Sequence, residues 1–204
     1  MNGESLDEQL YLYPGTKVLR NKLGIQDADA LDYAERMLVR DRMAQGCPGG
    51  DFDLGHLQAI HRHLFQDVYG WAGEIRRVPL SKGKSRFFPP DRIGLAMQDI
   101  HSRIVKQDHL RGLRPNRFAE EAARIIGDVN VVHPFREGNG RTQAIYLQQL
   151  GERARHTVDL TRLERERWIE ASIRASRANP DYDAMRDCIR AAMPGRDRDR
   201  GMER

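Results

Sequence analysis

The chain has 204 residues, of which 31% are charged and 39% are hydrophobic, and its formal net charge at neutral pH is +4. This length suffices for one domain with a sizeable core. No window approaches the roughly 18 consecutive apolar residues of a membrane-spanning helix, and the polar, acidic N-terminus is unlike a signal peptide.

The two cysteines, Cys47 and Cys188, are isolated and lack metal-ligand spacing. Such thiols are typical of a reducing compartment, so we expect a cytoplasmic protein. The mildly basic balance is compatible with anionic partners. Basic residues are scattered among acids, however, and aromatic residues do not interleave with them, which disfavours direct nucleic-acid binding.

The first 50 residues are predicted to form an arm and helices that pack on the main domain. Residues 1–15 are polar, then aromatic, and end in a Pro-Gly turn. We expect a short helix over Lys17–Leu23 because Gly24 supplies a stop signal. Asp27 is a candidate N-cap for a helix to about Gln45. Its apolar positions, spaced by three and four, predict a buried face of Leu31, Ala34 and Leu38.

A second helix is predicted from Asp53, and its inner stripe consists of Leu57, Ile60, Leu64 and Val68. Three histidines lie on the same helix: His56, His61 and His63. Because His61 and His63 are two residues apart, they point away from each other on a helix. The spacing therefore favours a histidine-rich helix surface over a metal site.

The segment 76–88 has no helical period and includes a proline and a glycine. It predicts a small β-hairpin with a strand near Arg77–Leu80, a turn at Ser81–Lys84 and a return near Arg86–Phe88. The tripeptide at 83–85 matches the end of a P-loop. Val78 stands where the first P-loop glycine is required, so that interpretation is rejected.

Five helices are predicted in the second half of the chain. The first begins at Pro90 or Asp91, the second is a core helix capped by Asn116 that ends at His133, and the third starts near Gly138. Thr161 with Glu164 fits a capping box before the fourth, and Asp181 opens the last, which Pro194 ends. The predicted buried positions of the first two are Ile93, Met97, Ile100, Ile104, Phe118, Ala122, Ile125, Val129 and Val132.

One stretch, residues 133–141, combines four kinds of chemistry where a helical pattern begins. A glycine-rich turn entering a helix points backbone N–H groups and the positive end of the helix dipole at one spot, which is an anion site. Arg141 adds a guanidinium suited to phosphate, and Glu137 beside phosphates suits a Mg²⁺ ligand. His133 can accept a proton near neutral pH. A base, a metal and a polyphosphate together predict phosphoryl-type or nucleotidyl transfer.

The same stretch, His-Pro-Phe-Arg-Glu-Gly-Asn-Gly-Arg, resembles the signature of the Fic family, H-x-F-x-[D/E]-G-N-G-R-x-x-R. Residues 71–76 and 88–90 also resemble the family, and the likeness extends over roughly residues 50 to 190. It implies an all-α, mainly helical Fic fold, in which a helical bundle surrounds a helix–loop–helix active site with a β-hairpin flap. The expected organisation is an N-terminal arm with helices over 1–50, a Fic domain over 51–193 and a disordered tail over 194–204.

The resemblance implies protein adenylylation (AMPylation), with ATP as the substrate and Mg²⁺ as the cofactor. His133 is then the catalytic base that activates a hydroxyl group of a target protein, Glu137 is the metal ligand, and Phe135 anchors the loop in the core. The flap holds the target by strand addition. The nucleotide-binding residues implied by the family are Lys82, Gly83, Gly138, Asn139, Gly140 and Arg141.

The sequence departs from the signature at its last position, where Ala144 replaces arginine. In the family this arginine meets the γ-phosphate, and loss of one charge-assisted contact costs on the order of 1.5–3 kcal/mol. The alternatives are a weakened enzyme, a non-catalytic nucleotide- or partner-binding module, and a transferase that uses another nucleotide or phospho-donor. Gln143, Lys82 and Lys84 are candidates to compensate.

The family's inhibitory motif, [S/T]-x-x-x-E-[G/N], is not found near either end of the sequence. The resemblance therefore implies the class of bacterial toxins that a small separate antitoxin protein regulates with an inhibitory helix. Toxins of that class modify type II topoisomerases. We expect a cytoplasmic bacterial protein with these two kinds of protein partner.

Overall fold

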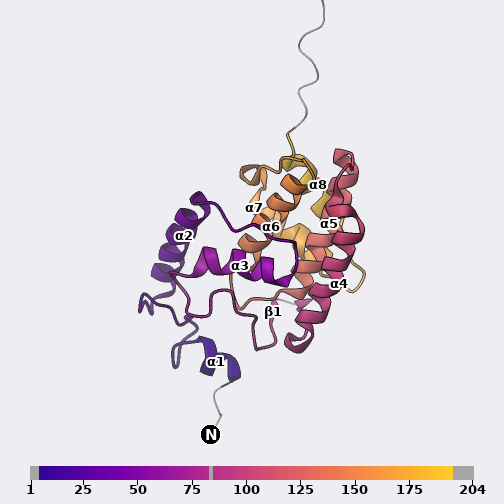
Figure 1. Cartoon of the computed structure of the whole chain (residues 1–204). Coiled ribbons are helices and arrows are strands. Elements are labelled where there is room, and N and C mark those ends of the chain that lie inside the picture. The colour runs from indigo at the N-terminus through magenta and orange to yellow at the C-terminus, as the bar shows by residue number, and fades with distance from the viewer. Residues whose placement is uncertain (1–4, 83–84, 195–204) are drawn as a thin grey trace, which may run out of the picture.

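The computed structural model describes residues 5–82 and 85–194, and this part of the chain is mainly helical (Figure 1). The all-α prediction is confirmed. The α-helices are α1 (Leu6–Tyr11), α2 (Ala28–Ala44), α3 (Leu54–Phe65), α4 (Ile93–Lys106), α5 (Pro115–Val132), α6 (Asn139–Arg153), α7 (Arg165–Ala175) and α8 (Asp183–Ala192). Short 3-10 helices are η1 (Pro90–Arg92), η2 (Asp108–Leu110) and η3 (Leu160–Arg162).

Helix α5 is the centre of the bundle and packs against α4, α6, α7 and α8. Figure 1 shows α4 and α5 side by side, with α2 and α1 on the opposite side of the molecule. All the apolar positions predicted for α4 and α5 are buried. Burying a Val, Ile, Phe or Met side chain contributes about 1.5–3 kcal/mol, so these contacts stabilise α5, which leads into the segment that follows it.

Helix α2 begins as predicted, with the Asp27 carboxylate accepting from the Ala30 N–H at 2.8 Å. Its buried face is Leu31, Glu35 and Val39, and not the predicted Leu31, Ala34 and Leu38. The difference has a physical cause, since Glu35 has polar partners inside the protein and is drawn inward with them. Helix α3 also departs from the prediction, because His56 and His61 are buried.

The segment before α2 was predicted wrongly. Residues 17–23 form no helix, and Leu19 instead pairs with Leu12 in an isolated antiparallel bridge. The Asn21 side chain accepts from the backbone of Leu23 and Ile25, a local pattern that competes with helix formation. The helix lies earlier, at α1, where Ser5 and Glu8 form a capping box.

The predicted hairpin exists but is shifted toward its tip. Strands β1 (Ser81–Lys82) and β2 (Ser85–Arg86) are antiparallel, with Ser81 opposite Arg86. The Phe87 N–H donates to the Leu80 carbonyl at 3.1 Å and continues the ladder beyond the strands. Gly83 and Lys84, part of the predicted turn, lie outside the described residues, as do residues 195–204 of the predicted tail.

Four helix starts differ from their predictions. Helix α4 begins at Ile93, after η1, and not at Pro90 or Asp91. Helix α5 begins at Pro115 without a side-chain cap, and Asn116 instead accepts from Arg190. Thr161 belongs to η3, which Asp159 caps, so the predicted capping box does not form. Helix α8 begins at Asp183, two residues after the predicted start.

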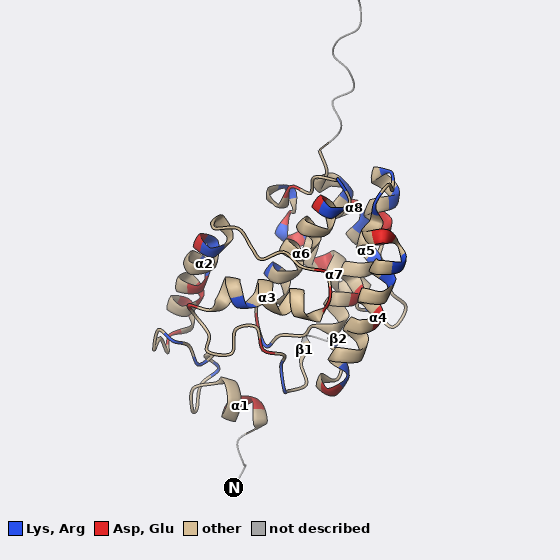
Figure 2. Cartoon of the chain, in the orientation of Figure 1, with Lys and Arg blue, Asp and Glu red and all other residues tan. Residues whose placement is uncertain are grey.

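Acidic and basic residues are interspersed over the helices (Figure 2), as the sequence predicted. In the described part of the chain, no helix has the length and apolar character needed to cross a membrane.

Candidate active site

The loop between α5 and α6 has a defined backbone shape at both ends. His133 ends α5 with a left-handed backbone (φ 49°), and Gly138 precedes α6 with φ 82°. A Cβ at Gly138 would lie 2.4 Å from the Phe65 ring, so this position requires glycine for both conformation and space. The predicted helix–loop–helix is confirmed.

The loop is braced from within by Asn139. Its Oδ1 accepts from the Phe135 N–H at 3.0 Å, and its Nδ2 donates to the Phe135 carbonyl at 2.8 Å. The side chain is buried. What Asn139 offers to a ligand is therefore its backbone N–H, while its amide holds the loop.

The start of α6 has the features of an anion site. No side chain in the part of the chain that the structure describes caps it, and the first-turn N–H groups of a helix have no intrahelical partners. The Gly138 N–H donates to Glu137 Oε1 at 2.9 Å. Gly140 is exposed, and a Cβ built there meets no atom of the described residues within 4 Å, so the first turn is open at this position.

His133 is half-buried and stacks on Phe87 of the hairpin, with ring centroids 3.7 Å apart. Its Nδ1 lies 3.3 Å from the Asn130 carbonyl oxygen. A carbonyl can only accept, so Nδ1 carries the proton in the neutral ring and Nε2 has the lone pair. The imidazole is thus oriented by α5 on one side and by the hairpin on the other.

Arg76, whose role the sequence analysis missed, holds the histidine backbone. It is buried and donates four hydrogen bonds, to the carbonyl oxygens of His133, Val78, Phe88 and Val132. Burial lowers the pKa of this guanidinium. Because its partners belong to both α5 and the hairpin, Arg76 joins the two segments. The only sign of this role in the sequence was that Arg76 lies in the stretch 71–76, which resembles the family.

His61 supports the other end of the loop. Its Nδ1 accepts from the Gly73 N–H at 2.8 Å and its Nε2 donates to the Glu137 carbonyl at 3.0 Å. The ring stacks on Phe135 with centroids 3.9 Å apart, and Phe135 is buried as predicted. Burial, with a smaller contribution from the Arg141 charge, lowers the pKa of His61 to about 4.

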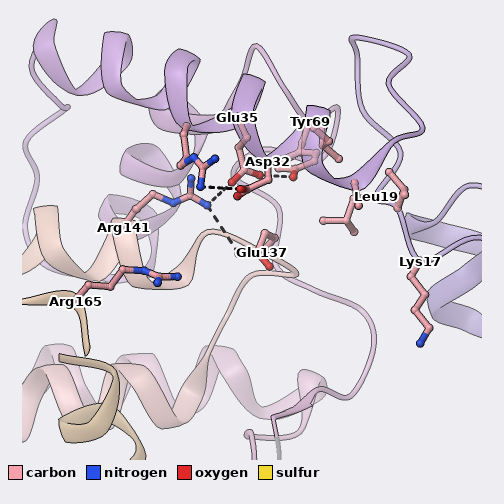
Figure 3. A pocket seen from close by; sticks show the side chains of 12 residues that line it. Lys17, Leu19, Asp32, Glu35, Tyr69, Glu137, Arg141 and Arg165 are labelled. Carbon is pink, nitrogen blue, oxygen red and sulfur yellow. Dashed lines mark hydrogen bonds and ion pairs between the residues drawn. The ribbon is translucent and has the colours of Figure 1, made fainter. Parts of the chain in front are cut away.

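A pocket of about 680 Å³ lies between the loop, α2 and the start of α7 (Figure 3). Arg141 reaches across it and donates to Glu35, which also accepts from the Tyr69 hydroxyl. Glu35 is only 5% exposed. Burial, followed by the Glu35 charge, raises the pKa of Tyr69. Sequence reasoning missed Glu35 because it expected the apolar face of α2 to lie one position away.

The N-terminal helix contacts the same loop. Arg136 forms a two-point ion pair with Asp7 of α1, at 2.7 and 2.9 Å. Its guanidinium also lies 5.9 Å from the centroid of the Tyr11 ring. The arm is therefore attached to the loop that carries His133.

The other residues predicted to contact the nucleotide or to compensate for Ala144 are Lys82, Gly83, Lys84 and Gln143. Lys82 lies in β1, and Gly83 lies outside the described residues. Gln143 is buried, its Nε2 has no hydrogen-bond partner among the described residues, and it does not line the pocket. It is thus badly placed to replace the arginine missing at Ala144.

Glu137 is the residue of this site that is suited to bind Mg²⁺. Among residues 5–82 and 85–194, no group of three or more His, Cys, Asp or Glu side chains is arranged to hold a metal. The Glu137 side chain is 49% exposed, beside the open first turn of α6. Because Mg²⁺ in nucleotide sites is commonly bound through one or two carboxylates and substrate phosphates, a single exposed carboxylate fits it.

Known proteins share this architecture. The chain is 40% identical over 164 residues to a probable protein adenylyltransferase of Sinorhizobium fredii, covering 80% of this chain and 85% of the relative. It is 34% identical over 198 residues to a probable protein adenylyltransferase, Fic, of Salmonella typhimurium, covering 94% of each. The crystal structure of the BepC effector of Bartonella tribocorum with bound AMPPNP superposes with a TM-score of 0.86 at 28% identity, covering 93% of this chain and 99% of that one.

These likenesses confirm the predicted Fic fold. The model of the Fic/DOC family matches residues 51–150, which include the whole loop between α5 and α6. The chain belongs to the Fic/DOC family.

Proposed function

We propose that this protein transfers AMP from ATP to a hydroxyl side chain of a target protein. It is an enzyme, a protein adenylyltransferase, as its relatives at 34–40% identity are named. The observation that carries the mechanism is that one loop presents an oriented imidazole at one end and an uncapped helix start with an arginine at the other.

His133 acts as the base. With Nδ1 donating to Asn130, Nε2 takes the proton of the target hydroxyl while the oxygen attacks the α-phosphorus of ATP. The new P–O bond forms as the bond to pyrophosphate breaks, and the target retains AMP. A positioned base of this kind typically contributes about 10²–10⁴ in rate.

The phosphates lie over the first turn of α6. The backbone N–H groups of Asn139, Gly140 and Arg141 and the helix dipole offset their negative charge, and the open space over Gly140 admits them. Gly138 gives this turn its shape. Mg²⁺ on Glu137, when bound, would neutralise part of the triphosphate charge and strengthen pyrophosphate as a leaving group.

The target binds at the hairpin as an added strand. Support comes from the hairpin's contacts with the site: Phe87 stacks on His133, and the Phe88 N–H donates to the Val131 carbonyl at 3.1 Å. A strand added along β1 or β2 would bring its side chains close to His133. Lys82 and Gly83 are proposed to contact both target and nucleotide from this flap.

The biological setting remains the one that the sequence suggested. We place the protein in the bacterial cytoplasm as a toxin, with a type II topoisomerase as the target and a small antitoxin that supplies an inhibitory helix. The broad pocket beside Arg141 is large enough for side chains of such a partner.

Ala144 favours one alternative, a Fic protein with weakened transfer that serves as a nucleotide- or partner-binding module. Binding of ATP without label transfer to any protein would support it. A related alternative, the use of another nucleotide or phospho-donor, is tested by offering several labelled donors side by side.

The decisive test is His133→Ala with ATP labelled at the α-phosphate and a lysate or purified topoisomerase as the target. We expect label transfer to the target by the wild-type chain and its loss in the variant, with the melting temperature unchanged. Undiminished transfer by the variant would exclude His133 as the base.

A further inference from the structure

Four basic and three acidic side chains line the pocket beside the loop, and most are already paired. Arg36 pairs with Asp32 at 2.8 Å. Arg141 pairs with Glu35 and lies 3.9 Å from Glu137. The two remaining cations are Lys17 and Arg165, and Figure 3 shows that they differ in direction. Lys17 is directed away from Arg141, whereas Arg165 extends beside it.

Arg165 is in an unfavourable position for a cation. It is the first residue of α7, where the positive end of the helix dipole repels a guanidinium. Within the described ranges it has no ion pair, since the neighbouring Glu164 pairs with Arg167. It also lines the same pocket as the guanidinium of Arg141 and extends beside it (Figure 3). A bound anion would relieve both repulsions at once.

The charges close to the loop show why this cation matters. Arg141, Glu35 and Glu137 carry one positive and two negative charges, a net charge of −1. That balance repels a triphosphate. Arg165 brings the net charge of this group of four side chains to zero before any metal is counted, so it supplies the charge that Arg141 loses to its buried partner Glu35.

We propose that Arg165 is a phosphate-binding residue that contacts the pyrophosphate end of the nucleotide, together with Arg141. It approaches from α7 and so takes over the cationic role that α6 lacks at Ala144. This assignment rests on the proposed function in that the anion is the β,γ-portion of ATP. The binding measurement below does not depend on transfer.

The experiment compares wild type, Arg165→Ala, Arg165→Lys and the control Arg167→Ala, all as the full chain. Arg167 lies on the same helix and is exposed, but does not line the pocket. Binding of ATP and AMP with Mg²⁺ is measured by calorimetry, inorganic pyrophosphate is used as a competitor, and AMP transfer is measured in parallel.

Loss of one charge-assisted contact corresponds to roughly a ten- to hundredfold weaker affinity. We expect that loss for ATP and pyrophosphate in Arg165→Ala, unchanged AMP affinity, partial recovery in Arg165→Lys and no effect in Arg167→Ala. Equal ATP affinity in Arg165→Ala and Arg167→Ala would overturn the assignment, even if the wild type transfers AMP. Conversely, an Arg165-dependent ATP affinity without any transfer would sustain the assignment and contradict the proposed function.

Discussion

The Arg76 guanidinium donates to the carbonyl oxygen of His133 at 2.7 Å, although the two residues are 57 positions apart in sequence. The carbonyl belongs to a residue with left-handed backbone geometry, which few non-glycine residues adopt without support. Arg76 therefore fixes the position of the proposed base without touching its ring.

Replacing Arg76 by lysine should disrupt this support. A lysine ammonium has three donors and no planar fork, so it cannot serve the four carbonyl groups that Arg76 joins. We expect a loss of about 2–4 kcal/mol in the free energy of unfolding, since buried carbonyls are left unpaired. Denaturant titration measures this. Arg77→Lys, at the exposed neighbouring position, is the control and should change stability by less than about 0.5 kcal/mol.

Glu35 provides a second test of a buried polar contact. Glu35→Gln retains an acceptor for Tyr69 but removes the charge that pairs with Arg141. We expect a loss of about 1–3 kcal/mol in the free energy of unfolding. Asp32→Asn breaks an exposed ion pair in the same pocket and should cost about 1 kcal/mol or less. Equal losses of unfolding free energy in the two variants would show that burial does not strengthen the contacts of Glu35.

Gly138, at the end of the loop, and Gly140, in the first turn of α6, should respond oppositely to replacement by alanine. Gly138→Ala places a Cβ against Phe65 at a positive φ, so we expect marked destabilisation and loss of AMP transfer. Gly140→Ala meets open space within a helix and should stabilise the protein by up to about 1 kcal/mol. If phosphates lie over this turn, Gly140→Ala should nevertheless weaken ATP binding. Thermal melts and ATP titration of both variants separate the effects, and unaltered ATP affinity in Gly140→Ala would argue against the proposed phosphate position.

His61 should make stability depend on pH. Its pKa falls from 6.5 in the unfolded chain to about 4 in the folded protein, so the unfolded state binds more protons between these values. The stabilisation is complete above pH 6.5 and is lost as the pH falls toward 4, by up to about 3 kcal/mol at 1.36 kcal/mol per unit.

The measurement is the free energy of unfolding of wild type and His61→Gln between pH 4 and 7. We expect the part of the slope due to His61 to disappear in the variant. His63→Gln, on the same helix, is the control for the general effect of replacing a histidine by glutamine. Parallel profiles for wild type and His61→Gln would mean that the buried ring is not responsible.

The sequence by itself determined the features that depend on residues close together in the chain. Apolar residues at helical spacing in α4 and α5 predicted which side chains are buried, and Asp27 predicted where α2 begins. The stretch 133–141 predicted a loop between two helices because the apolar pattern of one helix ends at His133 and the next helix begins near Gly138.

Only the tertiary structure decided which polar side chains are inside. Glu35, His61 and Arg76 look like surface residues when judged by residue type, and each is buried because its partners come from distant segments: Arg141, Glu137 and His133. The spacing of apolar residues in the sequence shows which face of a helix is hydrophobic. It does not show which polar side chains form hydrogen bonds with distant segments. A buried polar group is stable only when it is paired, so its position follows from contacts that exist only after the chain has folded.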